Sequence, residues 1–502
     1  MVKLDGLDNG DLSSIVEELR CRLGGSSDFI VRLIQDERNR IDKYAVCYID
    51  GLVDKSLLAF LLEAVVAEAR EDAVHPSDLA ASLASRVPVG ALADAATEDS
   101  LVQAMLNGEV VIIGAGRSGG LSVAIPGGPS RSIEEPSSQT VVRGPKDGFT
   151  ENLADNLSLV RRRLRTPDLR IEDRILGRYT RTKIAVVYIH GIVQPVILDE
   201  LRRRLDKIDI DSILESGYIE ELIQDTAWTP FPTIQNTERP DSVSAYLLEG
   251  HAAVLVDGTP FALLLPVTFF KFFLSSEDYY QRHDIASFVR MIRFFSFFVS
   301  LLLPSLYIAV TTFQQEMIPT TMLISLAAQR EGIPLPALLE ALLMELTFEV
   351  IREAGIRMPR VIGPAISIVG ALVLGQAAVQ AGLVSGAMVI IVSFTAIASF
   401  VIPALGMSAA IRLMRFLLML LAGSFGLFGV LIGMIPLLLH LVALRSFGVP
   451  YLLPIAPLNW GNFKDLFFRM PWRVLKQRPA VIGSRNPRRQ PKRNRHGEGN
   501  RT

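Results

Sequence analysis

A run of carboxylates lies inside the most apolar part of the sequence. The segment PALLEALLMELTFEVIREAGIRMPR (336–360) carries acidic side chains among leucines, at Glu340, Glu345, Glu349 and Glu353. Carboxylates among membrane segments are costly, so they usually face a protein interior or a water-filled path. Rings of such side chains select the ions in many cation pores. The segment therefore indicates a protein that moves or senses something across a bilayer.

The spacing of these acids predicts a charged helical face. At about 100° per residue, Glu345, Glu349 and Glu353 fall within an arc of about 80°, and Glu340 lies about 140° from Glu345. In a ring of subunits that face would form stacked acidic rings, which makes the four glutamates our pore or gate candidates. The alternative is an amphipathic helix that lies on the membrane plane and pairs its acids with arginines. The residues alone leave both interpretations open.

Other patterns that could support chemistry are weak. GAGRSG (114–119) follows a strand-like run and fits the G-x-G-x-x-G fingerprint, but strand-like LSVAIPGGPS follows where a nucleotide site needs a helix. We therefore expect a glycine-rich turn. The six histidines are scattered, and Cys21 and Cys47 give neither a metal-type spacing nor a disulfide framework. We expect a protein that is not an enzyme, with no catalytic residue, cofactor or metal.

The acidic segment belongs to a long apolar block. One membrane crossing needs about 20 apolar residues, and four segments meet that length: 294–315, 361–383, 386–407 and 414–443. Residues 319–328 and 335–351 are ambiguous, and we expect Pro436 to break the last segment into two pieces. Gly429 and Gly433 form a GxxxG step, which predicts tight helix packing.

The half of the chain before this block carries an internal duplication. KYAVCYIDGLV (43–53) reappears as KIAVVYIHGIV (183–193), and LNGEVVIIG (106–114) matches LEGHAAVLVDG (248–258). Each copy of the first run passes a glycine and leads into a helical stretch. The period is too long for a solenoid and indicates a duplicated domain. The expected fold class is an α/β cytosolic N-terminal domain of two similar lobes, then an all-α polytopic transmembrane domain and a short basic tail.

The expected domain boundaries follow from these features: a first lobe over 1–130, a linker over 131–149, a second lobe over 150–275, a transmembrane domain over 290–445 and a cytosolic tail over 446–502, disordered at its end. From Arg473 onward the tail holds ten Lys or Arg residues, a single acid and no interleaved aromatic run after Trp472, so we expect no nucleic-acid partner. The N-terminus has no apolar core after its basic residue and predicts no signal peptide, which keeps the lobes in the cytosol.

Several long motifs resemble those of the spore germination receptor A-subunit family, the GerA family of endospore-forming bacteria. They are TPFPTIQNTERPD (229–241), RGPKDGFTEN (143–152), SSEDYY (275–280), LPSLYIAVTTFQQEMIPT (303–320), AAQREGIPLPALLEALLMELTFEVIREAGIRMP (327–359) and LRSFGVPYLLPIAP (444–457). The resemblance runs from the first lobe to about residue 475. A sporulation-stage paralogue of the SpoVAF type shares the architecture and most of these motifs, so both assignments stay open.

The resemblance implies more than the residues show. Members are multi-pass proteins of the spore inner membrane that act beside a transporter-like B subunit and a lipoprotein C subunit. It implies a homo-oligomeric channel, a pentamer, that releases monovalent cations when nutrient is sensed. The paralogue would amplify ion release instead, and a non-conducting scaffold of the receptor cluster is a further alternative. The resemblance makes the loop motif a structural or coupling element rather than an active site, and its residues are Pro230, Phe231, Pro232, Gln235, Asn236, Glu238, Arg239 and Pro240.

Overall fold

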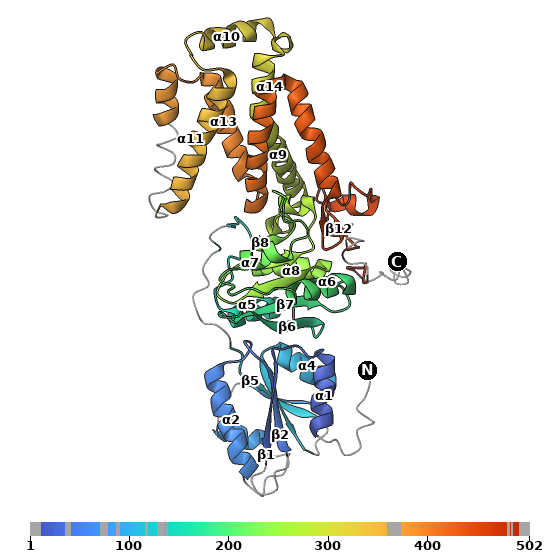
Figure 1. Ribbon diagram of the computed structural model, residues 1–502. Coiled ribbons are helices and arrows are strands. Elements are labelled where there is room, and N and C mark those ends of the chain that lie inside the picture. The colour runs from blue at the N-terminus through green and yellow to red at the C-terminus, as the bar shows by residue number, and fades with distance from the viewer. Residues whose placement is uncertain are drawn as a thin grey trace, which may run out of the picture. The chain divides into compact units, whose positions relative to one another are not determined.

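The computed structural model describes residues 12–35, 42–70, 79–86, 91–115, 119–127, 136, 139–358, 373–478, 482 and 485–490. The chain forms two compact units. An α/β unit comprises Met1–Gln224, Ile234–Pro266 and Leu475–Thr502, and a helical unit comprises Asp225–Thr233 and Val267–Val474. Figure 1 labels the helices and strands of both units. The domain boundaries drawn from the sequence remain predictions.

The α/β unit contains two lobes that share one sheet topology. The strand order is β1-β2-β4-β5-β3 in the first sheet and β6-β7-β9-β10-β8 in the second, and all neighbouring strands are antiparallel. The first lobe contains α1 (Leu12–Arg22), β1 (Phe29–Gln35), β2 (Asp42–Ile49), α2 (Lys55–Arg70), α3 (Leu79–Arg86), β3 (Leu92–Ala95), α4 (Glu98–Leu106), β4 (Glu109–Gly114) and β5 (Gly120–Ala124). The second contains α5 (Leu153–Arg163), β6 (Leu169–Leu176), β7 (Thr182–Ile189), α6 (Pro195–Leu205), α7 (Ser216–Ile223), β8 (Gln235–Thr237), α8 (Pro240–Glu249), β9 (Ala252–Val256) and β10 (Ala262–Leu265). The predicted duplication is confirmed as a duplicated sheet.

The apolar run of the duplication forms a strand that is buried on both faces. In β2, Tyr44, Val46 and Tyr48 pack with α2 and α3, whereas Ala45 and Cys47 pack with α1 and α4. Successive side chains of a strand point to opposite faces, so a sheet covered by helices on both sides needs a continuous apolar sequence. Figure 1 shows α2 and the pair α1 and α4 on opposite sides of this sheet.

The glycines of the duplication occupy matching turns. Gly51 and Gly191 follow β2 and β7 with φ of 81° and 79°, a conformation that glycine adopts at little cost. The glycine-rich stretch after β4 leads into β5, which pairs with β4 in antiparallel register, Ile112 opposite Leu121. A strand therefore follows where a dinucleotide site needs a helix, as predicted. Residues 116–118 themselves lie outside the described ranges.

A buried ion pair joins the two lobes. The Arg161 guanidinium on α5 donates from Nε and Nη2 to the two carboxylate oxygens of Asp28, each at 2.8 Å. Arg161 also donates to the Ser26 hydroxyl and to the Leu169 carbonyl oxygen. The Arg161 side chain is buried and that of Asp28 is 9% exposed. Because a bidentate arginine–carboxylate pair fixes orientation as well as distance, Arg161 contributes to the orientation of the lobes, together with hydrogen bonds such as that from Ser27 to Asp173.

The helical unit contains the apolar block. Its elements are η1 (Phe269–Phe273), η2 (Ser276–Tyr279), α9 (His283–Thr312), η3 (Gln315–Met317), α10 (Thr320–Arg330), α11 (Ala337–Arg357), α13 (Gly386–Phe400), α14 (Leu405–Ala443), β11 (Arg445–Ser446), β12 (Val449–Pro450) and η4 (Trp460–Asp465). Among the described residues, α9 and α14 are long and apolar enough to cross a membrane, and α13 is a shorter apolar helix. Most of the predicted span 361–383 lies outside the described residues. The predicted span 386–407 is divided, because α13 ends at Phe400 and α14 begins at Leu405.

Helix α14 folds back on itself at Gly426. This residue has φ 62° and ψ −142°, which leaves 21 of the 39 residues before it and 17 after it. The break expected at Pro436 was wrong: Pro436 lies inside the helix, and glycine supplies the conformation that reverses the chain. The predicted tight packing is confirmed, because side chains at Gly429 and Gly433 would collide with Leu421 and Leu418 of the first limb.

Candidate functional site

The acidic helix α11 turns two of its carboxylates toward α14. The Glu345 carboxylate lies 2.8 Å from Arg415 Nη2, and both side chains are buried. Glu349 lies 2.6 Å from Arg412 Nη1 and 3.5 Å from Arg415 Nη2. Arg352, on α11 itself, approaches Glu349 at 3.7 Å. The acids thus face guanidinium groups within the same chain.

This charge network is incompletely satisfied. Glu345 Oε1, Arg415 Nε and Nη1 and Arg412 Nε are buried without a hydrogen-bond partner. Arg352 Nη2 donates to the Ser399 hydroxyl at 2.6 Å, and its guanidinium lies over the Phe400 ring at 4.7 Å. Unpaired polar atoms in a low-dielectric interior carry a large desolvation cost. The network therefore contains buried polar atoms whose hydrogen bonds an ion or water could supply.

The other two predicted glutamates have different surroundings. Glu340 is fully buried, and its carboxylate accepts hydrogen bonds from the backbone amide and the hydroxyl of Ser385, at the start of α13. Glu353 is exposed and pairs with Arg357 one turn along α11, at 2.6 Å. The structure thus brings Glu345 and Glu349 together and places Glu340 and Glu353 apart from them. Their role as pore or gate residues stays a prediction.

Between Leu339 and Val350, the surface that α11 leaves exposed is apolar rather than acidic. Its exposed large side chains recur at intervals of four, three and four residues, at Leu339, Leu343, Leu346 and Val350. This spacing marks one helical stripe. On the packed side, Ala341 joins the core of the helical unit with residues of α9, α13 and α14. This face of α11 is therefore apolar and open, while Glu345 and Glu349 point inward. Beyond Val350, the exposed stripe continues with the charged pair Glu353 and Arg357.

The first part of the loop motif belongs to the helical unit and contacts both ends of α14. The Thr229 hydroxyl lies 2.8 Å from His440 Nε2 in the last turn, and the buried Phe231 ring lies 6.3 Å from the same imidazole. Pro232 lies against Gly406 in the first turn. Its carbonyl oxygen accepts a 2.7 Å hydrogen bond from the Tyr451 hydroxyl. The reversal at Gly426 brings both ends of α14 to this loop.

The second part of the motif belongs to the α/β unit and holds the chain that joins the lobes. Arg239 is buried, binds Asp241 in bidentate fashion at 2.8 and 3.1 Å, and donates to the carbonyl oxygen of Pro145 at 2.9 Å. The Glu238 carbonyl oxygen accepts from the amide of Phe149 at 2.8 Å. Pro240 starts α8, where its missing N–H costs nothing. Two of the motifs that carry the resemblance, 143–152 and 229–241, therefore pack together here.

Gln235 and Asn236 of the motif face α8 and α7. The Tyr246 hydroxyl donates to Gln235 Oε1 at 2.5 Å. Burial, reinforced by repulsion from Glu215, raises the pKa of Glu220 on α7 to about 7, and a hydrogen bond with Asn236 partly opposes this shift. Glu220 is thus a carboxylic acid that titrates near neutral pH.

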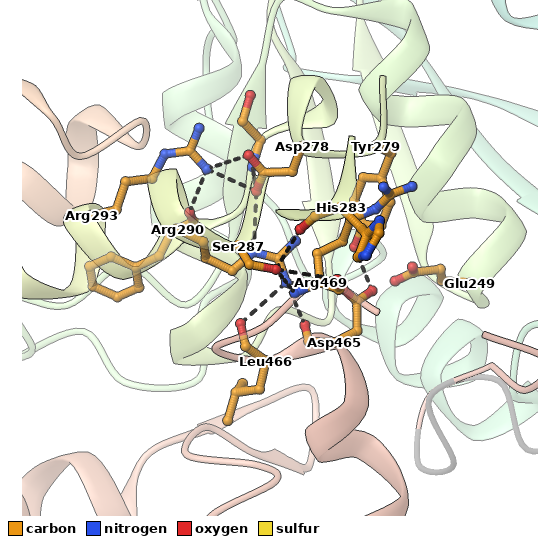
Figure 2. A network of polar contacts seen from close by, with 12 residues as sticks. Glu249, Asp278, Tyr279, His283, Ser287, Arg290, Arg293, Asp465, Leu466 and Arg469 are labelled. Carbon is orange, nitrogen blue, oxygen red and sulfur yellow. Dashed lines mark hydrogen bonds and ion pairs between the residues drawn. The ribbon is translucent and has the colours of Figure 1, made fainter. Parts of the chain in front are cut away.

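A second ionic network, absent from the sequence predictions, ties the start of α9 to the segment after α14. Figure 2 shows Asp278, Arg290, Arg293 and Asp465 converging. Asp278 lies 2.7 Å from Arg293 Nη1 and 3.3 Å from Arg290 Nε, and Arg290 Nη1 lies 2.9 Å from Asp465. The sequence contained one signal for this network: Arg290 and Arg293 lie near the start of an apolar helix, shortly after the acidic motif SSEDYY (275–280).

Together these features define a class of protein: a pair of duplicated α/β lobes combined with a helical unit that holds two membrane-length helices and buried ion pairs. Residues 17–481 match the family described as Bacillus/Clostridium GerA spore germination protein. The chain belongs to this family.

Curated relatives agree with this assignment. Spore germination protein KA of Bacillus subtilis (strain 168) is 47% identical over 482 residues, which cover 96% of this chain and 88% of that protein. Spore germination protein GerLA of Bacillus cereus is 38% identical and covers 96% of this chain and 98% of its own length. A membrane protein of Bacillus subtilis (strain 168), YfkQ, is 42% identical over 96% of this chain and 93% of its own. The crystal structure of the N-terminal domain of the A subunit of the Bacillus megaterium spore germinant receptor GerK3 is 38% identical, covering 53% of this chain and 99% of that one with a TM-score of 0.42.

Proposed function

We propose that this chain is the A subunit of a nutrient germinant receptor, and that copies of it form a channel, a pentamer, which releases monovalent cations when nutrient is sensed. The observation that carries the proposal is the buried charge network between α11 and α14, with Glu345 and Glu349 facing Arg412 and Arg415. Ionisable groups among apolar membrane helices are expensive, and they usually mark an ion pathway. The family membership supports the same function.

In the proposed closed state, the exposed apolar stripe of α11 lines the pore and excludes water. A hydrophobic constriction of this kind gates by dewetting. Opening would turn α11, separate Glu345 and Glu349 from their arginines and give the carboxylates to water and cations. The unpaired polar atoms of the network favour this exchange, because hydration would satisfy them.

The loop motif serves as the coupling element in this proposal. Its residues 229–232 touch the first and the last turn of α14, so a displacement of the loop reaches both limbs of the helix that carries Arg412 and Arg415. A transporter-like B subunit and a lipoprotein C subunit are the proposed partners that supply the signal. The proposed location is the spore inner membrane, crossed several times, with the lobes in the cytosol and no nucleic acid bound.

A second candidate function has a specific observation in its favour. The three acids Glu340, Glu345 and Glu349 all find partners within the same chain, which is also what a purely structural network requires. A non-conducting scaffold of the receptor cluster would use the ion pairs only to hold α11. An amplifying paralogue of the SpoVAF type would conduct without a B subunit.

Potassium flux from liposomes tests the proposal. The vesicles hold the full chain with its cognate B and C subunits, with or without nutrient. Wild type is compared with Glu349→Gln and, as the control, with Asp209→Asn, an exposed change in the α/β unit. We expect nutrient-dependent flux in wild type and in the control, and a changed rate or ion selectivity in Glu349→Gln. Assembled wild-type oligomers without flux would favour the scaffold, whereas flux without the B subunit would favour the paralogue.

A further inference from the structure

All three tryptophans of the chain belong to the helical unit, and all three are exposed. The exposed fractions are 95% for Trp228, 75% for Trp460 and 46% for Trp472. A tryptophan buries a large apolar area when it packs, so exposure of every one is costly in water. Its amphipathic ring is instead well suited to the boundary between a bilayer and water, where tryptophan is enriched.

The three tryptophans gather at the same end of the membrane-length helices. Trp472 stacks near Tyr279, 5.7 Å between ring centroids, just before α9 begins at His283. Trp228 precedes Thr229, which contacts His440 in the last turn of α14. Trp460 opens η4, whose Asp465 binds Arg290 in the first turns of α9. Each tryptophan therefore lies beside the end of a helix that can span the bilayer.

The segment from 455 to 474, which follows α14, has one inward and one outward face. Its polar groups point inward: Asp465 binds Arg290 and Tyr279, and Arg469 donates to the Gln281 carbonyl oxygen (Figure 2). Leu466 is buried and the Phe467 ring packs against Phe270 and Phe294. The other large apolar side chains are exposed, and they are Ile455, Leu458, Trp460, Phe468, Met470, Trp472 and Val474. So many exposed large apolar side chains in one segment mark a surface that binds another apolar phase.

The charges of the outward face are basic. Lys464 and Arg473 are exposed. The single acid of the segment, Asp465, binds Arg290 and Tyr279 on the inward face. Basic side chains near a membrane surface attract anionic lipid headgroups. A basic, aromatic and apolar face is complementary to the interfacial region of an anionic bilayer.

We propose that residues 455–474 and Trp228 form an interfacial collar, which lies in the headgroup region of an anionic lipid bilayer around the ends of α9 and α14. The occupant is lipid rather than a protein surface, because the outward face is continuous with the ends of the two helices that are long enough to cross the membrane. This inference rests on the membrane location in the proposed function and not on ion conduction.

Tryptophan fluorescence of the full chain tests the collar directly, since only three residues contribute. Three variants each keep one tryptophan and replace the other two by phenylalanine. They are reconstituted in phosphatidylcholine–phosphatidylglycerol vesicles with bromine either near the headgroups or near the chain ends. We expect headgroup-level bromine to quench each tryptophan about twofold more than deep bromine, as an interfacial position requires. Aqueous iodide should quench them weakly.

The outcomes separate the collar from the rest of the proposal. Resistance of the chain to alkaline extraction from the vesicles tests whether its helices span the membrane, independently of where the tryptophans lie. An extracted chain would overturn the membrane location, whereas a resistant chain with iodide-accessible, bromine-insensitive tryptophans would overturn the collar alone. Protection from iodide without bromine quenching would assign the face to a second copy or a protein partner, which also overturns it.

The basic residues give an independent arm of the test. In Lys464→Gln/Arg473→Gln, quenching of Trp460 and Trp472 should fall in anionic vesicles and match wild type in neutral phosphatidylcholine. Arg178→Gln, an exposed change in the α/β unit, is the control and should leave quenching unaltered. Equal quenching of wild type and the double variant in anionic vesicles would remove the headgroup preference from the proposal.

Discussion

Arg415 Nη2 lies 2.8 Å from Glu345 Oε2, and each of the two side chains is 1% exposed. The pair joins α11 to the first limb of the reversed helix α14. A charge at this depth is tolerated only while its partner is present, because a single buried charge has neither water nor a counterion. A rearrangement of α11 that separates the two residues must therefore bring water or another counterion to both charges.

Removing one partner of this pair should be more damaging than removing both. Glu345→Gln leaves Arg415 with only the longer contact to Glu349, at 3.5 Å, and we expect a loss of roughly 3 kcal/mol in stability. The double variant Glu345→Leu/Arg415→Met should recover most of that loss. Thermal stability of the detergent-solubilised oligomer measures both. The exposed pair partner Glu353→Gln is the control, and equal stability of Glu345→Gln and Glu353→Gln would contradict the burial argument.

Replacing Gly426 should unfold the reversal in α14. A Cβ atom at this position would lie 2.8 Å from Gln314 Oε1 and from Phe313 Cβ, and its φ of 62° with ψ of −142° is nearly reserved for glycine. We expect Gly426→Ala to cost roughly 1–3 kcal/mol through the backbone alone. Size-exclusion profiles after heating measure the loss. Gly386→Ala, whose nearest atom lies at 3.8 Å, is the matched control; similar melting of the two variants would refute the assignment of the break.

Loss of Arg161 should loosen the two lobes from each other. Arg161→Ala leaves Asp28 partly buried without its guanidinium, and a cost of roughly 3–5 kcal/mol is expected for such a pair. Amide hydrogen exchange of the full chain should speed up in residues 26–29 and 169–173. The exposed pair Arg178–Asp209 supplies the control, because Arg178→Ala should change exchange very little. Unchanged protection in Arg161→Ala would show that the lobes are held by other contacts.

The stability of α7 should fall as pH rises toward neutrality. The pKa of Glu220 is raised to about 7 in the folded unit, whereas an unfolded glutamate has a pKa of about 4.3. The unfolded state therefore releases its proton first, and stability is lost between about pH 4.3 and pH 7 and then levels off. Glu220→Gln should remove this slope. Amide exchange of residues 216–223, corrected for the intrinsic pH dependence, is the measurement, and identical slopes in both proteins would exclude Glu220 as the cause.

The lobes were predictable because their signal is local and repeated. Two copies of KxAVxYIxG, each followed by a second matching strand near 106–114 or 248–258, imply that the same sheet occurs twice. The order of the five strands within each sheet was not predicted, because it depends on which strands pair. The continuous apolar character of β2 follows from burial on both faces.

The charge network was only partly predictable. Helical periodicity places Glu345 and Glu349 on one face, but it cannot say which element that face meets. Arg412 and Arg415 complete the site from a distance of more than sixty positions in the chain, so only tertiary packing reveals the pairing. The break in α14 was misplaced for a related reason. Proline is tolerated inside an apolar helix when neighbouring groups satisfy the freed carbonyl, and a glycine with positive φ gives no distinct signal in a glycine-rich span.

The reversal at Gly426 gives α14 the mechanics of a clip rather than a rod. A straight helix that is anchored at one end transmits a force along its axis, whereas both ends of α14 contact residues 229–232. Moving Thr229 away from Pro232 would spread or pinch the two limbs and change their separation along the whole length. Arg412 and Arg415 lie within the first two or three turns of α14. In the proposed coupling, a small lateral displacement of the loop would therefore act directly on the groups that hold Glu345 and Glu349.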